Sequence, residues 1–121
     1  ERNQMNILVN AQGLILMDET PVQIGEVREK LKEFIDNPND DETLSVSPEA
    51  AIVSLKTQKE TPYRIYIDML DEVMGAYKEL RDNASRANYG VEFARLQPDS
   101  PQRKQIQDMY PKKISIAAEE D

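Results

Sequence analysis

Two segments of this chain carry apolar residues on one helical face only, and this pattern restricts the fold more than any other feature. In the first segment the apolar residues at helical spacing are Ile24, Val27, Leu31, Phe34 and Ile35. In the second they are Tyr66, Met69, Leu70, Val73, Tyr77 and Leu80. A helix that is apolar on one side has to bury that side, so both helices are expected to cover a β-sheet.

Prolines and glycines set the expected ends of these helices. The first helix ends before Pro38, because a proline disfavours helical geometry in the residue before it. Thr61 is the expected N-cap of the second helix and Pro62 its first residue. The second helix is expected to continue past Asn83, with Gly90 as its interruption. An acidic loop at residues 37–48 separates the two halves.

Short apolar runs supply the strands of the expected sheet. Residues 5–9 and 14–17 flank a turn in which Gly13 takes a positive φ, which predicts an antiparallel hairpin. Asp18–Pro21 is expected to be a polar turn. Residues 51–57 predict a central strand and residues 113–117 a closing strand. Ser100 and Pro101 favour a short helix up to Met109, and residues 119–121 an acidic tail.

This order, ββ–α–β–α–β, predicts a two-layer α+β domain with a small mixed sheet and two main helices on one face. The 121 residues suffice for one such domain, spanning residues 1–121.

Charge and composition exclude several functions. The net charge is −8 and the longest basic doublet is Lys112–Lys113, which argues against nucleic-acid binding and against docking onto anionic lipid. The chain has no histidine, the commonest acid–base catalyst, and no cysteine. Without them, the usual nucleophile pairs and the ordinary zinc and iron–sulfur sites are missing. We therefore expect no enzyme, no cofactor and no metal.

A cluster of carboxylates and a group of tyrosines can each be interpreted either as ordinary surface and core residues or as a binding site. Asp68, Asp71 and Glu72 share a helical face and could bind Ca²⁺ or Mg²⁺, although such a face is more often solvated. Three tyrosines lie on or near the second apolar stripe: Tyr63, Tyr66 and Tyr77. Packing in the core or at an interface is expected for them in preference to a ligand site.

The edges of the expected sheet are the candidate functional site. An open edge has unpaired backbone donors and acceptors, so it is either protected or used to bind a partner strand. Met5–Val9 and Lys113–Ala117 are the candidate edge strands. The candidate partner-binding residues are Ile7, Val9, Lys113, Ile114, Ser115 and Ile116. In the alternative interpretation, Lys112 and Lys113 protect the edge against pairing.

Several segments, in this order, resemble the ExbD/TolR biopolymer-transport family. Val53–Thr57 followed by Thr61–Tyr63 is similar to the family's strand and its proline-tyrosine helix start. The apolar helix stripe continues the likeness, with Ile67, Leu70 and Asp71 at matching spacing. The opening hairpin and first helix contribute Ile7–Asn10, Gly13–Leu16, Val22 and Leu31. The resemblance covers residues 5–80 and, more loosely, Ile114–Ile116; the loop at 37–48 is longer and residues 91–111 are inserted.

The resemblance implies a function. Members of this family have one transmembrane helix and a periplasmic domain anchored in the bacterial inner membrane. They form homodimers with an ExbB- or TolQ-like proton channel and pass proton-motive force to a TonB- or TolA-like protein. The chain begins at Glu1 rather than methionine, so we expect it to be the periplasmic domain without its membrane helix. The family's functional aspartate lies in that helix, so no relay residue is expected here.

Two other functions remain open from the sequence. One is a TolR-like contact with peptidoglycan in the cell envelope. The other is a ferredoxin-like regulatory domain that senses a small molecule.

Overall fold

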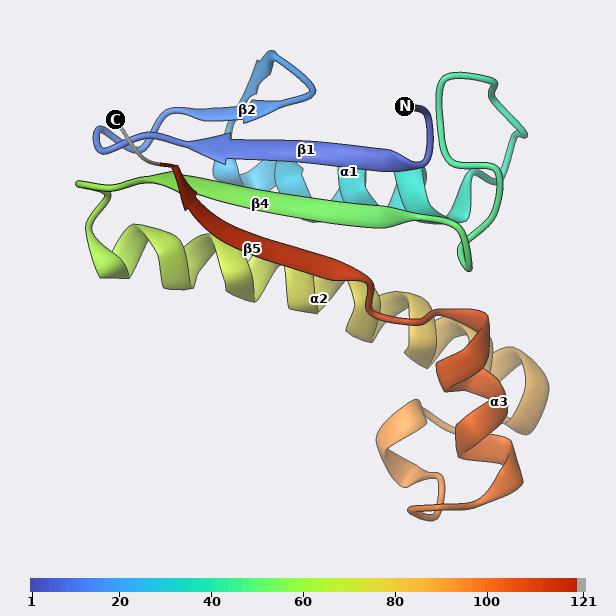
Figure 1. The fold of residues 1–121 in the computed structure, drawn as a ribbon. Coiled ribbons are helices and arrows are strands. Elements are labelled where there is room, and N and C mark those ends of the chain that lie inside the picture. Colours follow the sequence, from blue (N-terminus) through green and yellow to red (C-terminus); the bar gives the residue numbers. More distant parts are fainter. Residues whose placement is uncertain (120–121) are drawn as a thin grey trace.

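A five-stranded mixed sheet, with strand order β3-β2-β1-β4-β5, forms one layer of the domain, and α1 and α2 lie together on one of its faces (Figure 1). The computed structural model describes residues 1–119. The strands are β1 (Gln4–Val9), β2 (Ile15–Met17), β3 (Thr20–Val22), β4 (Ile52–Gln58) and β5 (Ile114–Glu119). The helices are α1 (Ile24–Asp36), α2 (Tyr63–Tyr89), the 3₁₀ helix η1 (Phe93–Arg95) and α3 (Pro101–Met109). The predicted fold class is confirmed.

The predicted hairpin is present. β1 and β2 pair antiparallel, with Val9 opposite Ile15. Gly13 has φ +85°, and the Asn10 side chain accepts a hydrogen bond from the Leu14 backbone N–H at 2.9 Å. The structure adds β3, most of which the sequence predicts to be part of a polar turn. That turn is confined to two residues with positive φ, Asp18 and Glu19.

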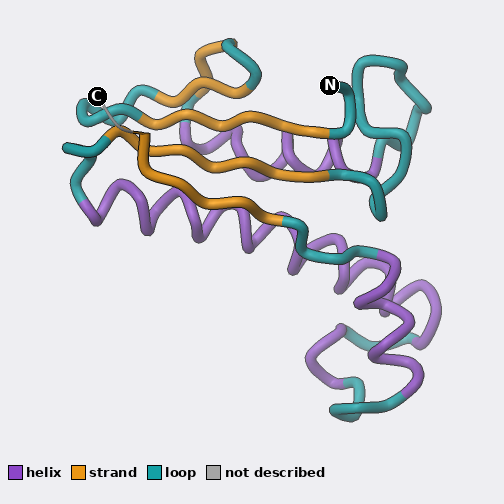
Figure 2. Tube along the Cα trace, in the orientation of Figure 1, coloured by secondary structure: helices purple, strands orange, loops and turns teal. Residues whose placement is uncertain are grey.

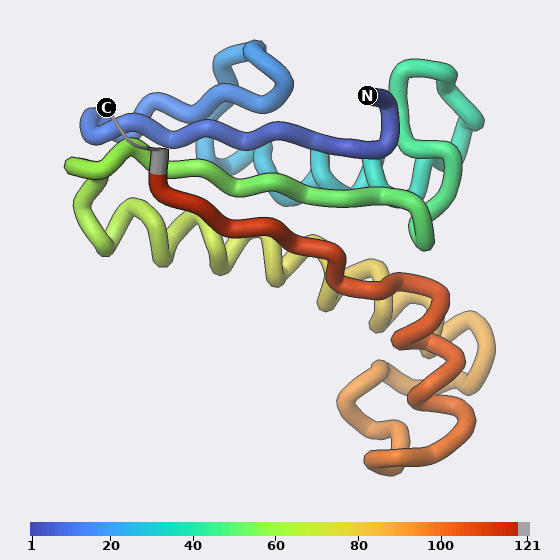
Figure 3. The backbone as a smooth tube through the Cα atoms, in the orientation of Figure 1, coloured from blue at the N-terminus to red at the C-terminus, as the bar shows by residue number. Residues whose placement is uncertain are grey.

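β4 lies in the interior of the sheet, as expected of the central strand predicted for residues 51–57, although β1 has the middle position. β4 pairs parallel with β1 on one side and with β5 on the other. Figure 3 shows this order as a green strand between a blue and a red one, so segments far apart in the sequence are neighbours. Val53 and Leu55 of β4 have no solvent exposure.

The prediction that Met5–Val9 is an edge strand is wrong. β1 has β2 on one side and β4 on the other, so its backbone is paired along both edges. Ile7 and Val9 are 1% and 0% exposed. The hairpin fills only one side of β1, and the chain fills the other when it returns after α1 as β4. Ile7 and Val9 are therefore core residues.

Local chemistry explains the helix ends. The Glu26 carboxylate accepts a hydrogen bond from the Gln23 backbone N–H at 2.8 Å, which caps α1. Asn37 ends α1 in the left-handed conformation, with φ 41°. For α2, the N-cap is Pro62 rather than the predicted Thr61. The Thr61 hydroxyl instead donates to the Val9 carbonyl oxygen at 3.4 Å, so it ties the helix start to β1.

Helices α1 and α2 pack closely at Gly75. A Cβ atom at Gly75 would lie 2.4 Å from Arg28 Cζ, so only glycine leaves room for the arginine. Arg28 crosses α2 there and donates to Glu79 at 2.8 Å and to Glu72 at 3.2 Å. Lys32 of α1 also donates to Glu79, at 2.9 Å.

The segment expected to be inserted, residues 91–111, lies within a larger helical projection of residues 81–113, and from here on we call this whole projection the insertion (Figure 2). It consists of the end of α2, η1 and α3, and it has its own small core of Ala84, Leu96 and Ile106. The predicted helix after Ser100 is confirmed, since the Ser100 hydroxyl accepts a hydrogen bond from the Arg103 N–H at 3.1 Å. The Tyr110 hydroxyl donates to Asp36 at 2.6 Å and ties the insertion to α1.

The first residue of the predicted acidic tail, Glu119, belongs to a strand. Glu119 is the last residue of β5, and Glu120 and Asp121 lie outside the described residues. Across residues 1–119, none of the helices combines the length and the apolar character that crossing a membrane requires.

Candidate partner-binding edge

β5 is an edge strand, as predicted, and its outer backbone groups are open. It pairs with β4 on one side, and within residues 1–119 no strand pairs with the other. The Lys113 carbonyl accepts a hydrogen bond from the Val53 N–H at 2.9 Å, so this carbonyl and the backbone groups of Ser115, two residues on, point to β4. Because these groups alternate along a strand, those of Ile114, Ile116 and Ala118 point outward. They form a row of donors and acceptors ready for a further strand.

The opposite edge of the sheet is protected. β3 has three residues, and its middle one is Pro21, which has no N–H group to donate. A short strand with a proline is a poor template for pairing. β5 has six residues and no proline. Of the two sheet edges, β5 is the one suited to pairing.

An apolar surface of α2 lies beside this edge. Tyr63, Tyr66, Leu70 and Met74 recur at helical spacing, roughly a quarter-turn from the buried stripe. Arg28 contacts the opposite flank of α2 through Glu72 and Glu79, so these four residues face away from α1. We call them the free flank of α2.

The free flank is incompletely covered. Tyr63 is 74% exposed and Met74 38% exposed. Tyr77 packs in the same core cluster as Ile114, so β5 lies along this side of α2 (Figure 1). Ile116 of β5 is 49% exposed. The open edge and the free flank therefore adjoin, and a strand added to β5 would have apolar side chains to pack against.

The two predicted gatekeeper lysines have different surroundings. The Lys113 ammonium group donates to the Glu49 carbonyl oxygen at 2.6 Å, so it fastens the start of β5 to the loop before β4. Lys112 remains exposed. Partial burial of its ammonium group and, to a lesser degree, the nearby Arg81 lower the pKa of Lys112.

The model of the family described as biopolymer transport protein ExbD/TolR matches residues 1–80. This match covers well over half of the chain. The chain belongs to the ExbD/TolR family. No match was found among curated proteins or among solved structures.

Membership confirms the resemblance seen in the sequence and indicates the general function of the family. ExbD/TolR proteins are subunits of biopolymer transport systems, are not enzymes and are membrane-anchored with a periplasmic domain. The match contains β1 to β4, α1 and α2 up to Leu80. The insertion and β5 follow it. The α2 helix therefore begins within the family's region and ends within the insertion.

The carboxylate cluster of this ExbD/TolR chain is partly occupied by protein contacts. Asp68, Asp71 and Glu72 line a hollow with Ile24 and Gly25. The Glu72 carboxylate accepts two hydrogen bonds from the Arg28 guanidinium, at 3.2 and 3.3 Å. In the part of the chain that the structure describes, no group of three potential ligands is placed to hold a metal ion.

The three tyrosines have separate roles. Tyr77 is fully buried, and burial raises its pKa to about 12. Tyr63 and Tyr66 lie on the free flank with ring centroids 5.9 Å apart. Packing is the role that the sequence favoured, and Tyr77 confirms it. The sequence does not predict that the half-buried Leu70 and the exposed Met74 lie on an uncovered flank, although their helical spacing from Tyr63 and Tyr66 is the available signal.

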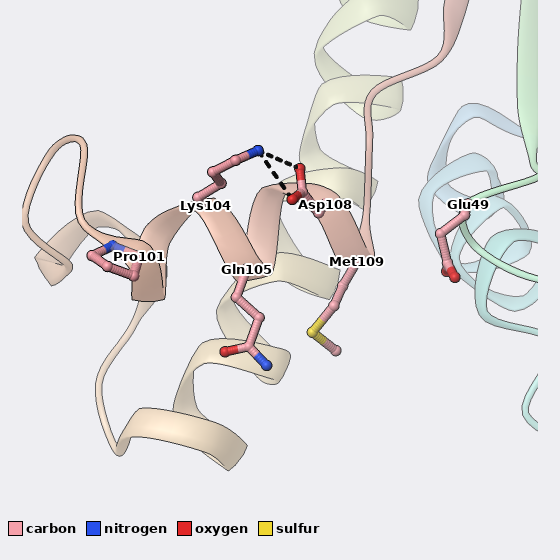
Figure 4. Close-up of a pocket in the computed structure, with 6 residues that line it drawn as sticks. All are labelled: Glu49, Pro101, Lys104, Gln105, Asp108 and Met109. Carbon is pink, nitrogen blue, oxygen red and sulfur yellow. Dashed lines mark hydrogen bonds and ion pairs between the residues drawn. The ribbon is translucent and has the colours of Figure 1, made fainter.

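A hollow also separates α3 from the loop at Glu49 (Figure 4). Its lining includes Met109 and the ion pair of Lys104 with Asp108, whose atoms are 3.2 Å apart. This ion pair neutralises both charges, and the hollow is wide open. It holds no arrangement of nucleophile and base.

Proposed function

We propose that this chain is the periplasmic domain of an ExbD-like subunit, which relays proton-motive force to a TonB-like protein for outer-membrane transport. In this proposal the full-length protein is anchored in the bacterial inner membrane, forms a homodimer and works with an ExbB-like proton channel. The family match supports the class of protein, and the open edge of β5 supports the means of contact.

The single observation that carries the proposal is the open edge beside the free flank. The backbone groups of Ile114, Ile116 and Ala118 offer hydrogen bonds to any extended segment, whatever its sequence. Each such bond contributes roughly 1 kcal/mol. The free flank adds apolar contacts that select the side chains facing it. An extended segment of the force-carrying protein fits this surface.

Backbone pairing also suits a mechanical role. The hydrogen bonds of a paired strand lie side by side, so a pull along the strand loads them together. β5 passes the load to β4 and hence to the buried centre of the sheet. No covalent bond is made or broken in such a relay, which agrees with a chain that has no histidine or cysteine.

The test is a titration of the labelled domain with a TonB-like linker peptide, followed by NMR. We expect shifts along residues 114–118 and in the free flank. Ile116→Pro removes an N–H group that points away from β4, so the domain should fold while binding is lost. Ile116→Thr is the matched control, because it changes the same side chain and keeps that N–H group. Equal binding by both variants, or shifts elsewhere, would refute pairing at β5.

A pull-down on isolated peptidoglycan separates this proposal from the TolR-like alternative. Retention of the domain on peptidoglycan, with no response to the linker peptide, would favour the envelope contact. A metabolite that raises the melting temperature would favour the small-molecule sensor. Both alternatives are outcomes of these experiments.

A further inference from the structure

The insertion differs in charge from the rest of the chain. Residues 81–113 hold seven basic and four acidic side chains, whereas the remaining residues hold eight basic and nineteen acidic. A positively charged projection therefore stands on a strongly negative body. The insertion leads directly into β5, so this charge lies at the start of the open edge.

Two arginines inside the insertion have no carboxylate partner among the side chains that the structure describes. Arg81 is 9% exposed and donates to the Tyr110 carbonyl oxygen at 3.0 and 2.8 Å. Arg81 and Arg103 both lie over the Phe93 ring, with Cζ 5.3 and 4.3 Å from its centroid. Arg103 also donates to the carbonyl oxygens of Phe93 and Leu96. Backbone carbonyls and a ring satisfy these groups, but they cancel neither charge.

Lys112 is a third cation, close along the chain to the Tyr110 carbonyl oxygen that Arg81 contacts. It follows Tyr110 by two residues and precedes β5 by two. Among residues 1–118, whose side chains the structure describes, neither Lys112 nor the two arginines takes part in an ion pair. Burial and, after it, the charge of Arg103 lower the pKa of Arg81, and burial and, after it, the charge of Arg81 lower the pKa of Lys112, so Arg81 is repelled by both of the other cations. An anion from outside the domain would relieve this repulsion.

The open edge fixes where such an anion would come from. A strand paired with β5 passes Lys112 at one end, and its inner side chains contact the free flank and Ile116. We propose that the segment bound by β5 is an acidic-ended strand, with apolar residues at alternate positions and one carboxylate beside Lys112. This inference rests on the proposed function and specifies the chemistry of its partner.

Three synthetic peptides with blocked ends test it. Each alternates valine and threonine; one has a glutamate at its C-terminal end, one at its N-terminal end, and one has glutamine in place of glutamate. Anisotropy titrations use the full chain at low salt. We expect one of the two glutamate peptides to bind about threefold to tenfold more tightly than the glutamine peptide. The preferred end gives the direction of the added strand.

Two charge variants make the assignment specific. Lys112→Gln should abolish the preference for glutamate. Lys59→Gln should preserve it, because Lys59 follows β4 at the opposite end of the edge and loses the same charge. The preference should also shrink at high salt, since exposed charges are screened.

The outcomes separate this inference from the proposed function. Equal binding of all three peptides, with shifts along residues 114–118, would overturn the inference and leave the proposed function standing. A preference that survives in Lys112→Gln would overturn it as well. Absence of binding by every peptide would count against pairing at β5 and so against both proposals.

Discussion

Gly75→Ala tests how the two main helices are held together. Glycine inside a helix costs about 1 kcal/mol relative to alanine, so the substitution by itself should stabilise α2. The new Cβ atom would lie 2.4 Å from Arg28 Cζ, 2.6 Å from Nη2 and 2.7 Å from Nε. Such distances are far below van der Waals contact. The guanidinium would have to leave its place.

The cost is the loss of the contacts of Arg28 with Glu72 and Glu79. These side chains are between 26% and 36% exposed, so solvent screens their charges in part. Pairs of this kind contribute up to about 1 kcal/mol each. If both pairs are lost in full, they cost up to about 2 kcal/mol. The helix gain of about 1 kcal/mol offsets part of this loss, so Gly75→Ala should lower the unfolding free energy by at most about 1 kcal/mol.

A double-mutant cycle measured by urea unfolding isolates the steric term. In the Arg28→Ala background nothing obstructs the new methyl group, so Gly75→Ala should stabilise by about 1 kcal/mol. Gly25→Ala is the control, because its Cβ would meet no atom within 4 Å and its effect should not depend on Arg28. An equal effect of Gly75→Ala in both backgrounds would refute the packing argument.

Three further predictions follow from single contacts. The hydrogen bond from Arg28, and to a lesser degree the one from Lys32, lowers the pKa of Glu79 below its usual 4.5. The ionised Glu79 therefore stabilises the fold fully above pH 4.5, and this stabilisation is lost as the pH falls through the lower pKa of the folded state. The stability advantage of the native chain over Glu79→Gln should thus vanish on acidification, as followed by circular dichroism. Ser100→Ala should cost about 1 kcal/mol, seen as faster hydrogen exchange in α3. Tyr110→Phe should cost about 1 kcal/mol in urea unfolding, because it removes the hydrogen bond to Asp36.

The local elements could be predicted because local chemistry decides them. Helical spacing gave the buried face of α1, and Asn10 with Gly13 gave the hairpin turn. The β3 strand was missed because Pro21 is untypical of strands and is tolerated only at an edge. The sequence predicts Thr61 as an N-cap, since a threonine hydroxyl can accept a hydrogen bond from the first turn of a helix. In the structure this hydroxyl instead donates to the carbonyl oxygen of Val9, which belongs to a distant strand.

Of the two strands predicted to lie at the sheet edges, one does. The backbone of Ile114–Ile116 lies at an edge, as the sequence reading expected of a closing strand. Ile7 and Val9 do not, because strand order depends on which side of β1 the returning chain occupies. That choice depends on contacts between residues about fifty positions apart, and periodicity within one segment is blind to it.

The sequence by itself determined the secondary structure, the one-faced helices and the family, because each of these is written in neighbouring residues or in their order. The tertiary structure alone decided which strand is open, which flank of α2 is left uncovered and that Arg81 and Arg103 meet over the Phe93 ring. The physical reason is that strand pairing and charge repulsion act through space. They depend on the distance between atoms, which the chain sets only when it has folded.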